Sequence, residues 1–426
     1  MPAANEGQDA IKVVGVGGCG VDYLASVACY PKPDEKLRTQ ALEVQGGGNC
    51  GNALTAAARL GLAPYVLSQV GGDSLGDGIA AELESEGVNT AGLLREPGFP
   101  SPFTYIIVDR EGGTRTCIHT PGPVLAPEAV DRAQVRQIVG GSKVVYFDGR
   151  LTEAAIVVRA EPCGARVAEI AAEVGVPILV EAERLRPNLD VLMGFADYLF
   201  TSENYPQDLT GLDSLGDAIL VLLSAHPKAR FVLTTLGKRG SVLVERCDAS
   251  GAGDESTLDD VVAALREELD GGAGAGGGAG CVRDGGAVEV RAGGVVSTSG
   301  PVRLVPSARG DAEAKARAAA AAARAAASNA RPGEADSGYG SGGDAEAVPV
   351  TARVYVAGAA SIVRGDVLDT TGAGDAFMGS TLYGLAKGLP RDAMMRLGAV
   401  VAATKCTKLG ARPGLPMRSE IDPELL

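Results

Sequence analysis

Several residue types are scarce in this 426-residue chain, and each scarcity argues against a class of function. Tryptophan is absent and aromatic residues make up only 4% of the sequence, so no extensive platform for stacking nucleic-acid bases is expected. The 39 basic residues are outnumbered by 53 acidic ones, and the net charge of −14 argues against binding a nucleic-acid backbone. No apolar run is long enough to span a membrane. The expected partners are therefore small molecules.

The sequence also lacks the paired cysteines of a metal site and an N-terminal signal for export. The eight cysteines are scattered without Cys-x-x-Cys spacing and only two histidines occur, so a zinc site is not expected. Free thiols fit a reducing intracellular compartment better than disulfides do. The first ten residues contain two acidic residues and no arginine, which suits neither a secretory signal nor a transit peptide. The cytoplasm is the expected location, or an organelle stroma if a transit peptide has been removed.

One long segment differs in composition from the rest of the chain. Residues 246–349 are rich in glycine, alanine, serine and acidic residues, and they lack the bulky apolar side chains that offset the entropy lost on ordering. We predict a low-complexity insertion that is mostly disordered, with one alanine-rich helix at 312–328. A disordered N-terminus is predicted for residues 1–10. Residues 11–245 and 350–426 then form a single domain.

The predicted domain alternates short apolar strands with helices, which is typical of a doubly wound α/β fold with a mostly parallel sheet flanked by helices. The strands are expected at 11–16, 63–70, 143–147, 177–180, 198–201 and 231–235, and helices include 53–60, 78–86 and 165–174. Two more polar regions, about 36–45 and 102–120, alternate with period two. They predict a small β-sheet lid beside the main body.

A glycine-rich junction near the C-terminus has the pattern of an anion site. The sequence Asp-Thr-Thr-Gly-Ala-Gly-Asp-Ala-Phe at 369–377 joins the apolar stretch 362–368 to a helical pattern. Its small residues Gly372, Ala373 and Gly374 let backbone N–H groups point at one spot, and the helix adds the positive end of its dipole. The junction is therefore predicted to hold a phosphate group.

Asp375 follows this loop on the first turn of the helix. A carboxylate beside a phosphate is unusual unless its charge is used, and phosphoryl transfer needs an oriented hydroxyl nucleophile. Asp375 is either the base that accepts the hydroxyl proton or an ordinary acidic residue at a helix N-terminus. A second Gly-Ala-Gly-Asp at 251–254 follows no apolar strand, so the four-residue string alone decides nothing.

Two N-terminal motifs could hold a hydroxylated ligand. Gly47 and Gly48 let the backbone approach a ligand, and Asn52 either caps the next helix or reaches a ligand hydroxyl. Asp22 follows the glycine-rich turn 15–20 and could accept hydrogen bonds from sugar hydroxyls.

The same turn matches Gly-x-Gly-x-x-Gly, so a dinucleotide-binding oxidoreductase is an alternative. Against it, Pro31 and Pro33 leave room for only a short helix, and no second strand ends in an acidic residue at the expected distance.

Taken together, these motifs resemble the ribokinase-like (pfkB) family of carbohydrate kinases. Residues 47–52 are similar to the family's N-terminal signature and residues 369–375 to its C-terminal signature. Three further segments are similar to family segments in the same order, at 69–76, 232–240 and 404–413. The resemblance covers residues 11–245 and about 350–423.

The resemblance implies an ATP-dependent sugar kinase with a ribokinase-like fold, acting on ribose, fructose or a related ketose. It implies that Asp375 is the catalytic base and that Gly372, Ala373 and Gly374 form the anion hole. The groups it assigns to ligands are Asp22, Gly47, Gly48 and Asn52 for the sugar, and Thr235, Gly237 and Gly240 for the nucleotide.

The family resemblance also implies bound metal ions and an oligomeric state. Mg²⁺ arrives with ATP, and Asp369 with the backbone of Thr371 and of residues 410–414 forms a site for a monovalent cation such as K⁺. A homodimer through the lid strands is the expected association.

One motif departs from the family pattern. Where many members have Asn-x-x-Glu, this chain has Ser202-Glu-Asn-Tyr205, so the group that organises the magnesium shell is not assigned. This departure and the insertion leave open a catalytically silent, kinase-like scaffold protein. A nucleoside kinase of the same family is a second alternative, because the resemblance implies relatives that accept nucleosides as well as sugars.

Overall fold

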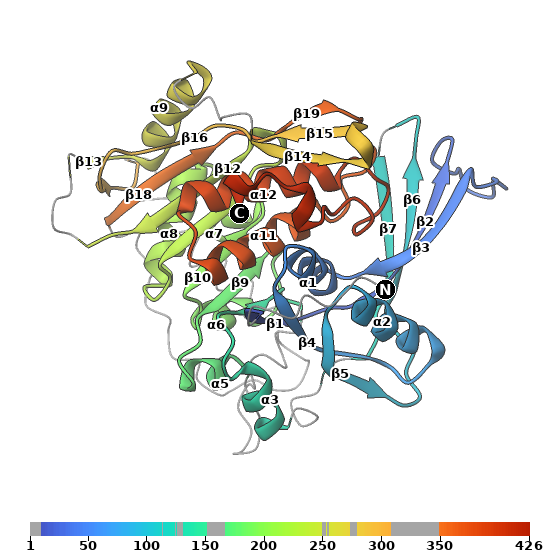
Figure 1. Cartoon of the computed structure of the whole chain (residues 1–426). Helices are drawn as coiled ribbons and strands as arrows, with labels where there is room; N and C mark the ends of the chain where they lie inside the picture. Colours follow the sequence, from blue (N-terminus) through green and yellow to red (C-terminus); the bar gives the residue numbers. More distant parts are fainter. Residues whose placement is uncertain are drawn as a thin grey trace.

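The computed structural model describes residues 10–112, 114–123, 125, 131–150, 167–248, 253, 255–272, 279–307 and 349–426. Its central feature is a 12-stranded sheet (Figure 1) in the order β13-β17-β18-β12-β11-β10-β9-β8-β1-β4-β5, with β16 paired to β18. Its parallel part comprises β1 (Lys12–Val16), β4 (Ala63–Gly71), β5 (Asn89–Glu96), β8 (Val145–Phe147), β9 (Ile178–Ala182), β10 (Tyr198–Thr201) and β11 (Phe231–Thr235). The predicted mostly parallel sheet is thereby confirmed.

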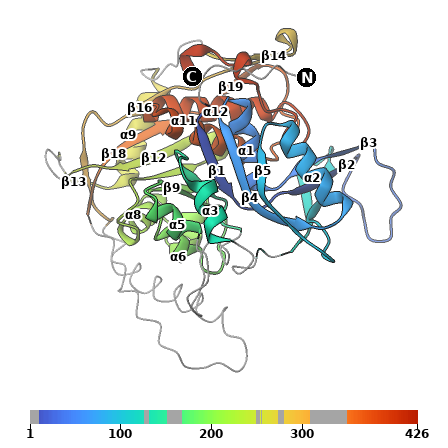
Figure 2. The same ribbon diagram turned by 60° about the horizontal axis from the view of Figure 1, so that its bottom comes forward.

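Helices cover both faces of this sheet (Figure 2). The sheet separates two hydrophobic cores, and successive residues of a strand point into different ones. Val13 and Leu179 pack in the first core, and Val14 and Val180 pack in the second. Both faces are therefore buried, which explains the continuous apolar runs of the parallel strands. The first face carries α1 (Asn49–Arg59), α2 (Ser74–Ser85), α11 (Ala373–Lys387) and α12 (Arg391–Lys405), and the second carries α3 (Arg132–Val139), α5 (Val167–Glu173), α6 (Leu189–Met193), α7 (Tyr205–Thr210), α8 (Leu215–Ala225) and α9 (Leu258–Asp270).

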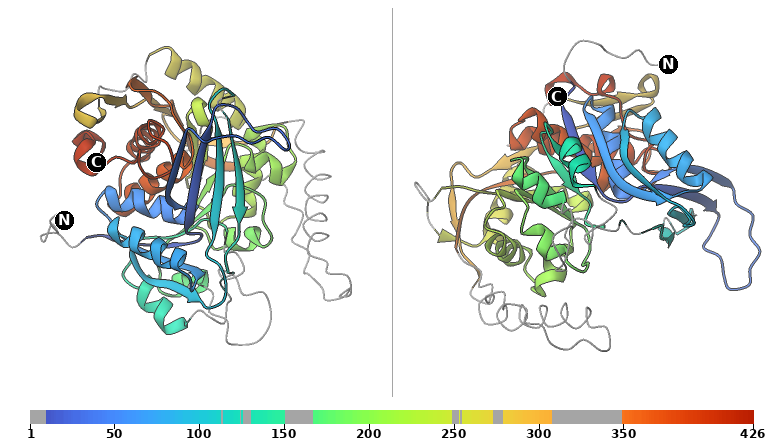
Figure 3. Two further views of the ribbon diagram at one scale, coloured as in Figure 1. Left: turned by 90° about the vertical axis from the view of Figure 1, so that its right-hand side faces the viewer. Right: turned by 90° about the horizontal axis from the view of Figure 1, so that it is seen from below.

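The lid is a separate four-stranded sheet in the order β3-β2-β6-β7, and its long strands stand forward in the left view of Figure 3. Its strands are β2 (Gly20–Val27), β3 (Ala41–Gly47), β6 (Phe103–Asp109) and β7 (Thr114–Thr120). The predicted lid is present, but β2 was missed. Because a strand follows the glycine-rich turn where a dinucleotide fold requires a helix, the oxidoreductase alternative is wrong.

The prediction that residues 246–349 are mostly disordered does not hold for the part that the structure describes. These residues lie between β12 (Ser241–Arg246) and β18 (Val350–Ala357), which form an antiparallel pair. They form α9 and the strands β13 (Glu255–Ser256), β14 (Gly280–Arg283), β15 (Val288–Arg291), β16 (Val295–Ser297) and β17 (Val302–Leu304). The predicted helix at 312–328 lies outside the described residues, as do residues 1–9.

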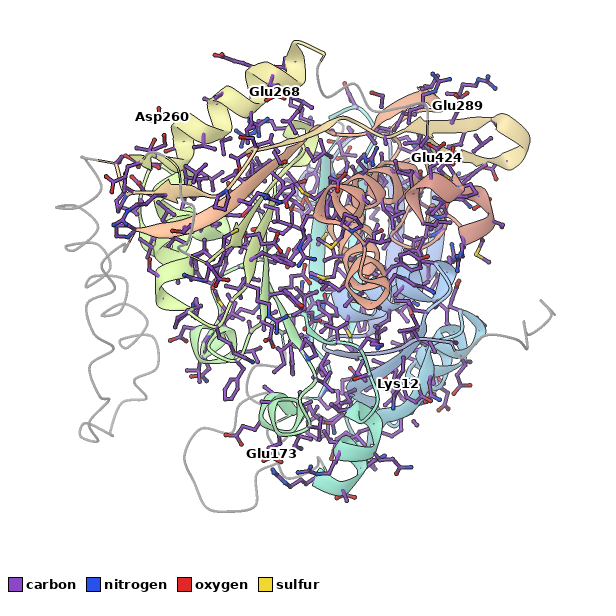
Figure 4. The ribbon with its side chains drawn as sticks, turned by 60° about the vertical axis from the view of Figure 1, so that its left-hand side comes forward. Lys12, Glu173, Asp260, Glu268, Glu289 and Glu424 are labelled. Atoms are coloured by element: carbon purple, nitrogen blue, oxygen red, sulfur yellow. The ribbon has the colours of Figure 1, made fainter. Side chains whose placement is uncertain are left out.

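Amphipathic patterning explains this order. Leu258 and Leu265 of α9 are buried in the second core, while Asp260 and Glu268 lie on its outer side (Figure 4). The strand β15 pairs with β14 on one side and with β19 (Ser361–Arg364) on the other, and β16 and β17 pair with β18. Short 3-10 turns complete the described chain at η2 (Gly237–Arg239), η3 (Asp284–Gly286), η4 (Arg418–Glu420) and η5 (Pro423–Leu425).

Candidate active site

Two helix N-termini meet beside the parallel sheet and bring together side chains that are distant in sequence. The helices α1 and α11 pack closely because α11 has Gly379 at the crossing, where a Cβ would lie 2.5 Å from the Ala53 carbonyl oxygen. Asn52 Nδ2 of α1 thus donates a hydrogen bond of 2.8 Å to Asp375 Oδ2 of α11. The two predicted site residues are in direct contact, and Asn52 does not serve as a helix cap.

Asp375 is held in a state suited to proton transfer. Its side chain is buried, with the residue 8% exposed, and burial raises its pKa to about 7. The hydrogen bond from Asn52 opposes this rise, whereas the nearby Glu183 adds to it. A carboxyl group with a pKa near neutrality can accept a proton during a reaction and release it afterwards.

The loop before α11 has the shape of an anion site. Gly372 has a φ of 74°, and a Cβ there would lie 2.7 Å from Ala411 Cβ, so glycine is required at this position. Gly374 is exposed and has no atom within 4 Å of the place where a Cβ would be. The N–H groups of Gly374 and Asp375 lie in the first helical turn, where the helix offers them no acceptor. An anion can therefore approach these N–H groups.

Asp22 lies on β2, opposite Gln45 of β3, at the base of the lid. Its carboxylate contacts Gly47, where a Cβ would lie 2.3 Å from Asp22 Oδ1. The next residue, Gly48, has a φ of 86° and packs against the Gly18 carbonyl group. Burial raises the pKa of Asp22 to about 6, and the charge of Arg412 opposes that rise. The structure therefore brings Asp22, Gly47 and Gly48 together as the sequence predicted.

Three residues of the lid beside Asp22 were not assigned to the site by the sequence argument. The strand register sets Gln45, Asp22, Thr104 and His119 in one row across the lid. His119 Nδ1 lies 3.2 Å from Thr104 Oγ1, and both polar atoms of the Gln45 carboxamide are buried without a hydrogen-bond partner in the described chain. A polar group that is buried and unpaired is costly unless a ligand completes it. Period-two alternation around Asp22 was the available signal.

Arg412 joins the parts of this site. The residue is 3% exposed, and its Nε donates to Asn52 Oδ1 at 3.0 Å while Nη2 donates to the Gly47 carbonyl at 3.2 Å. Its Nη1 lies 3.2 Å from Glu82 Oε1, and the same oxygen accepts the Gly46 N–H. Arg412 therefore fixes Asn52 in the orientation that serves Asp375. Arg412 lies in the segment 404–413 that resembles the family, but the sequence argument assigned it no role.

Carboxylates at the ends of β8 and β9 surround Asp375 and were also missed. Asp148 accepts hydrogen bonds from the Gly18 and Arg150 N–H groups at 2.7 and 2.9 Å. Glu181 accepts one from Tyr146, and its pKa is raised by burial first and by Asp375 second. Glu183 Oε2 lies 3.3 Å from Arg150 Nη2.

The predicted nucleotide residues lie at the carboxyl end of β11, where ligands bind in open α/β sheets. Thr235 ends that strand, and the turn after it has Gly237 at φ 55° and Gly240 at φ 84°. A Cβ on Gly240 would lie 1.9 Å from the Ala357 carbonyl oxygen. In the segment that departs from the family pattern, Glu203 is paired with Arg239 at 2.6 Å, and both side chains are about half exposed.

Asp369 is already saturated by protein donors. Its Oδ1 accepts from the Thr371 N–H and hydroxyl at 2.8 and 2.7 Å, and its Oδ2 accepts from the Gly410 N–H at 2.7 Å. Its carbonyl oxygen accepts a hydrogen bond of 2.6 Å from Lys405 Nζ. The predicted contacts to Thr371 and Gly410 are present, but an ammonium group lies where a monovalent cation was expected.

Two general properties complete the description. None of the helices in the described ranges has the length and apolar character needed to cross a bilayer. The seven cysteines that the structure describes are all free.

The comparisons with known proteins agree on one family. The model of the pfkB family carbohydrate kinases matches residues 12–261 and 341–418. Fructokinase-1 of Oryza sativa subsp. japonica is 27% identical over 268 residues, which are 57% of this chain and 79% of that protein. The ribokinase of Haemophilus influenzae is 23% identical over 270 residues, which are 59% of this chain and 85% of that protein.

Solved structures share the fold at low identity. The ribokinase of Arabidopsis thaliana complexed with ribose and ATP has a TM-score of 0.59 and 17% identity, with 96% of this chain and 97% of that one covered. The nucleoside kinase of Burkholderia thailandensis in complex with inosine has a TM-score of 0.54 and 14% identity, with 97% and 96% covered.

Proposed function

This chain belongs to the pfkB family of carbohydrate kinases, and from that premise we propose that it transfers the γ-phosphoryl group of ATP to a sugar hydroxyl. The observation that carries the proposal is the buried Asp375 carboxylate, oriented by Asn52 and set directly behind the exposed loop at Gly374. A base beside an anion site is the arrangement that phosphoryl transfer to an alcohol requires. The presence of both groups argues against the silent-scaffold alternative, which was motivated by the departure at 202–205 and by the insertion.

The mechanism follows from the geometry. Asp22 and the backbone at Gly47 and Gly48 would hold the sugar hydroxyls, which converts a bimolecular encounter into a positioned reaction. Asp375 would accept the proton of the attacking hydroxyl. The N–H groups at the start of α11 would stabilise the charge on the transferring phosphoryl oxygens.

Magnesium fits this site as a partner of the nucleotide. Mg²⁺ that arrives with ATP retains waters and substrate phosphates as ligands, so it needs few protein groups. Within the described ranges no group of three or more histidine, cysteine or acidic residues could hold a metal ion. When bound, the ion would neutralise charge on the β- and γ-phosphates. Glu183, whose side chain is 31% exposed near Asp375, is the acidic group best placed to contact its water shell.

The lid favours a sugar over a nucleoside. Tyr23 and Tyr105 lie one residue from Asp22 and Thr104 on their strands, so their rings lie on the opposite face of the lid, where they contact each other at a tilt of 40° with centroids 5.4 Å apart. The face with Asp22 carries Gln45, Thr104 and His119, which can hydrogen-bond hydroxyls. ADP release assayed with a panel of sugars and nucleosides should show turnover with ribose, fructose or a related ketose. Turnover with nucleosides alone would contradict the sugar assignment.

The raised pKa of Asp375 predicts a pH dependence. The base must be ionised, so kcat/KM should fall with unit slope as the pH drops below about 7. Asn52→Ala removes the donor that stabilises the carboxylate, and the acid limb should move upward by about one pH unit, because a hydrogen bond to a charged group contributes about 1.5 kcal/mol or more. An acid limb that stays in place in the variant would show that another group titrates.

The outer face of the lid predicts a homodimer. Leu42, Val44, Tyr105 and Ile118 are each more than half exposed, and the register places them on the face opposite Asp22. Such a patch is typical of a protein interface. Light scattering should show a dimer, and Val44→Glu should weaken it at least about tenfold. Val363→Glu, at an exposed position on β19, is the matched control; equal dissociation by both variants would exclude the lid as the interface.

A further inference from the structure

A lysine ammonium group is buried beside the loop that precedes the anion site. Lys405 is the last residue of α12 and is 0% exposed. Its Nζ donates a hydrogen bond of 2.6 Å to the Asp369 carbonyl oxygen. Burial lowers the pKa of this ammonium, and the Asp369 carboxylate opposes that change. A lysine is almost never fully buried unless its charge is paired.

The surroundings provide negative potential for the ammonium group of Lys405, and Asp369 already has a second cationic neighbour, since Arg115 Nη1 lies 3.9 Å from Asp369 Oδ1. The carboxylate of Asp369 is ionised in its contacts with Thr371 and Gly410, and its pKa is lowered despite burial, with Lys405 the largest favourable cause. The C-terminal end of α12 adds the negative end of a helix dipole. The backbone at Gly414 packs directly against the end of α12, since a Cβ on Gly414 would lie 2.1 Å from the Lys405 carbonyl oxygen.

These residues do not fit a free monovalent cation in addition to Lys405. An ion that used the Asp369 carbonyl oxygen would lie against the ammonium group bound to the same atom. Like charges in so enclosed a place repel strongly. The K⁺ ion expected from the sequence therefore does not fit alongside the Lys405 side chain.

We propose that Lys405 is a positioning residue whose ammonium group takes the place of a monovalent cation in ordering the anion loop. It fixes the Asp369 backbone, and the Asp369 carboxylate in turn holds the Thr371 N–H, one residue before Gly372. The loop thereby keeps its shape without a bound ion. The effect on turnover depends on the proposed kinase function, whereas the effect on stability does not.

The first test compares cations. Wild-type turnover should be the same within about twofold in K⁺, Na⁺ or tetramethylammonium buffers of equal ionic strength. Lys405→Met keeps the length of the side chain but removes its charge. Its turnover in tetramethylammonium should fall about 100-fold, since small displacements of catalytic groups have effects of this size, and K⁺ should restore at least about tenfold of it by binding at the vacated position.

The second readout needs no substrate. K⁺, but not tetramethylammonium, should raise the Tm of Lys405→Met, because an ion that binds only the folded state stabilises it. The Tm of the wild type should not respond. Lys408→Met is the matched control, because Lys408 is 43% exposed and pairs with Asp284 at 2.9 Å, and it should behave as the wild type in both assays.

The outcomes separate the two proposals. If no sugar is phosphorylated but the Tm of Lys405→Met responds to K⁺, the kinase proposal fails and the role of Lys405 stands. A wild type that requires K⁺, or a Lys405→Met variant indifferent to K⁺ in both assays, overturns the role of Lys405. If Lys405→Met does not fold, Lys405→Gln, whose uncharged carboxamide can still donate to Asp369, takes its place under the same criteria.

Discussion

Replacing Asp375 with Asn is expected to lower the turnover of sugar phosphorylation by about 10³-fold. The carboxamide has nearly the same shape, but it cannot accept the proton of the attacking hydroxyl. Asn52 can still donate to the side-chain oxygen, and the N–H groups of the anion loop are unchanged. Steady-state measurement of ADP release with the best sugar checks the prediction, and the affinity for ADP measured by calorimetry should change little.

The matched control distinguishes catalysis from helix capping. Asp392 lies in the first turn of α12, as Asp375 does in α11, but its side chain is 48% exposed. Asp392→Asn removes the same favourable charge from a helix N-terminus, which contributes about 0.3–1 kcal/mol, and should leave turnover unchanged. Comparable turnover by Asp375→Asn and the wild type would show that Asp375 only stabilises its helix.

Arg412→Met is expected to lower the free energy of unfolding by about 3 kcal/mol. The substitution removes the buried guanidinium, so Asn52 Oδ1 and the Gly47 carbonyl lose its hydrogen bonds, and Glu82 Oε1 keeps the Gly46 N–H but loses its cationic partner. Loss of a buried partner is costly because the remaining polar groups are not returned to water. Because Asn52 and Gly47 belong to the proposed sugar site, KM for the sugar should rise as well. Chemical denaturation and steady-state kinetics give the two values.

An exposed ion pair of the same length serves as the control. Arg364 Nη2 lies 3.2 Å from Glu289, as Arg412 Nη1 lies 3.2 Å from Glu82, but the Arg364 side chain is 63% exposed. Arg364→Met should cost less than about 1 kcal/mol, as is usual for surface pairs. Similar losses in the two variants would mean that burial of Arg412 does not determine its contribution.

The main fold could be predicted because its signals are local. The strands at Tyr198–Thr201 and Phe231–Thr235 have the bounds that the sequence predicted, since fully buried strands are short apolar runs. β2 was missed because it begins at Gly20 and carries Asp22, so the glycine-rich turn concealed its alternation. The helix α9 and the strands β13 to β17 were missed for a similar reason, because the apolar residues of residues 246–349 are diluted by glycine and alanine.

The site could be predicted only where its chemistry lies within one motif. Gly374 and Asp375 are adjacent in one motif, and Asn52 follows the glycine pair at 47–48 closely in the sequence. Each was therefore identified without knowledge of the fold. Arg412 contacts Asn52 across 360 positions, and Lys405 contacts Asp369 across 36. Gln45 is placed beside Asp22 by the pairing of β3 with β2. Contacts of this kind depend on topology, which no single segment specifies.

The most direct measurement of the central claim is ³¹P NMR of the reaction of ATP with the best sugar from the panel. With the wild type, the γ-phosphate signal should disappear as signals of ADP and of a sugar phosphate ester appear in equal amounts, and Asp375→Asn should leave the ATP signals nearly unchanged over the same time. Formation of ADP with inorganic phosphate and no ester, or equal ester formation by the two proteins, would contradict the account.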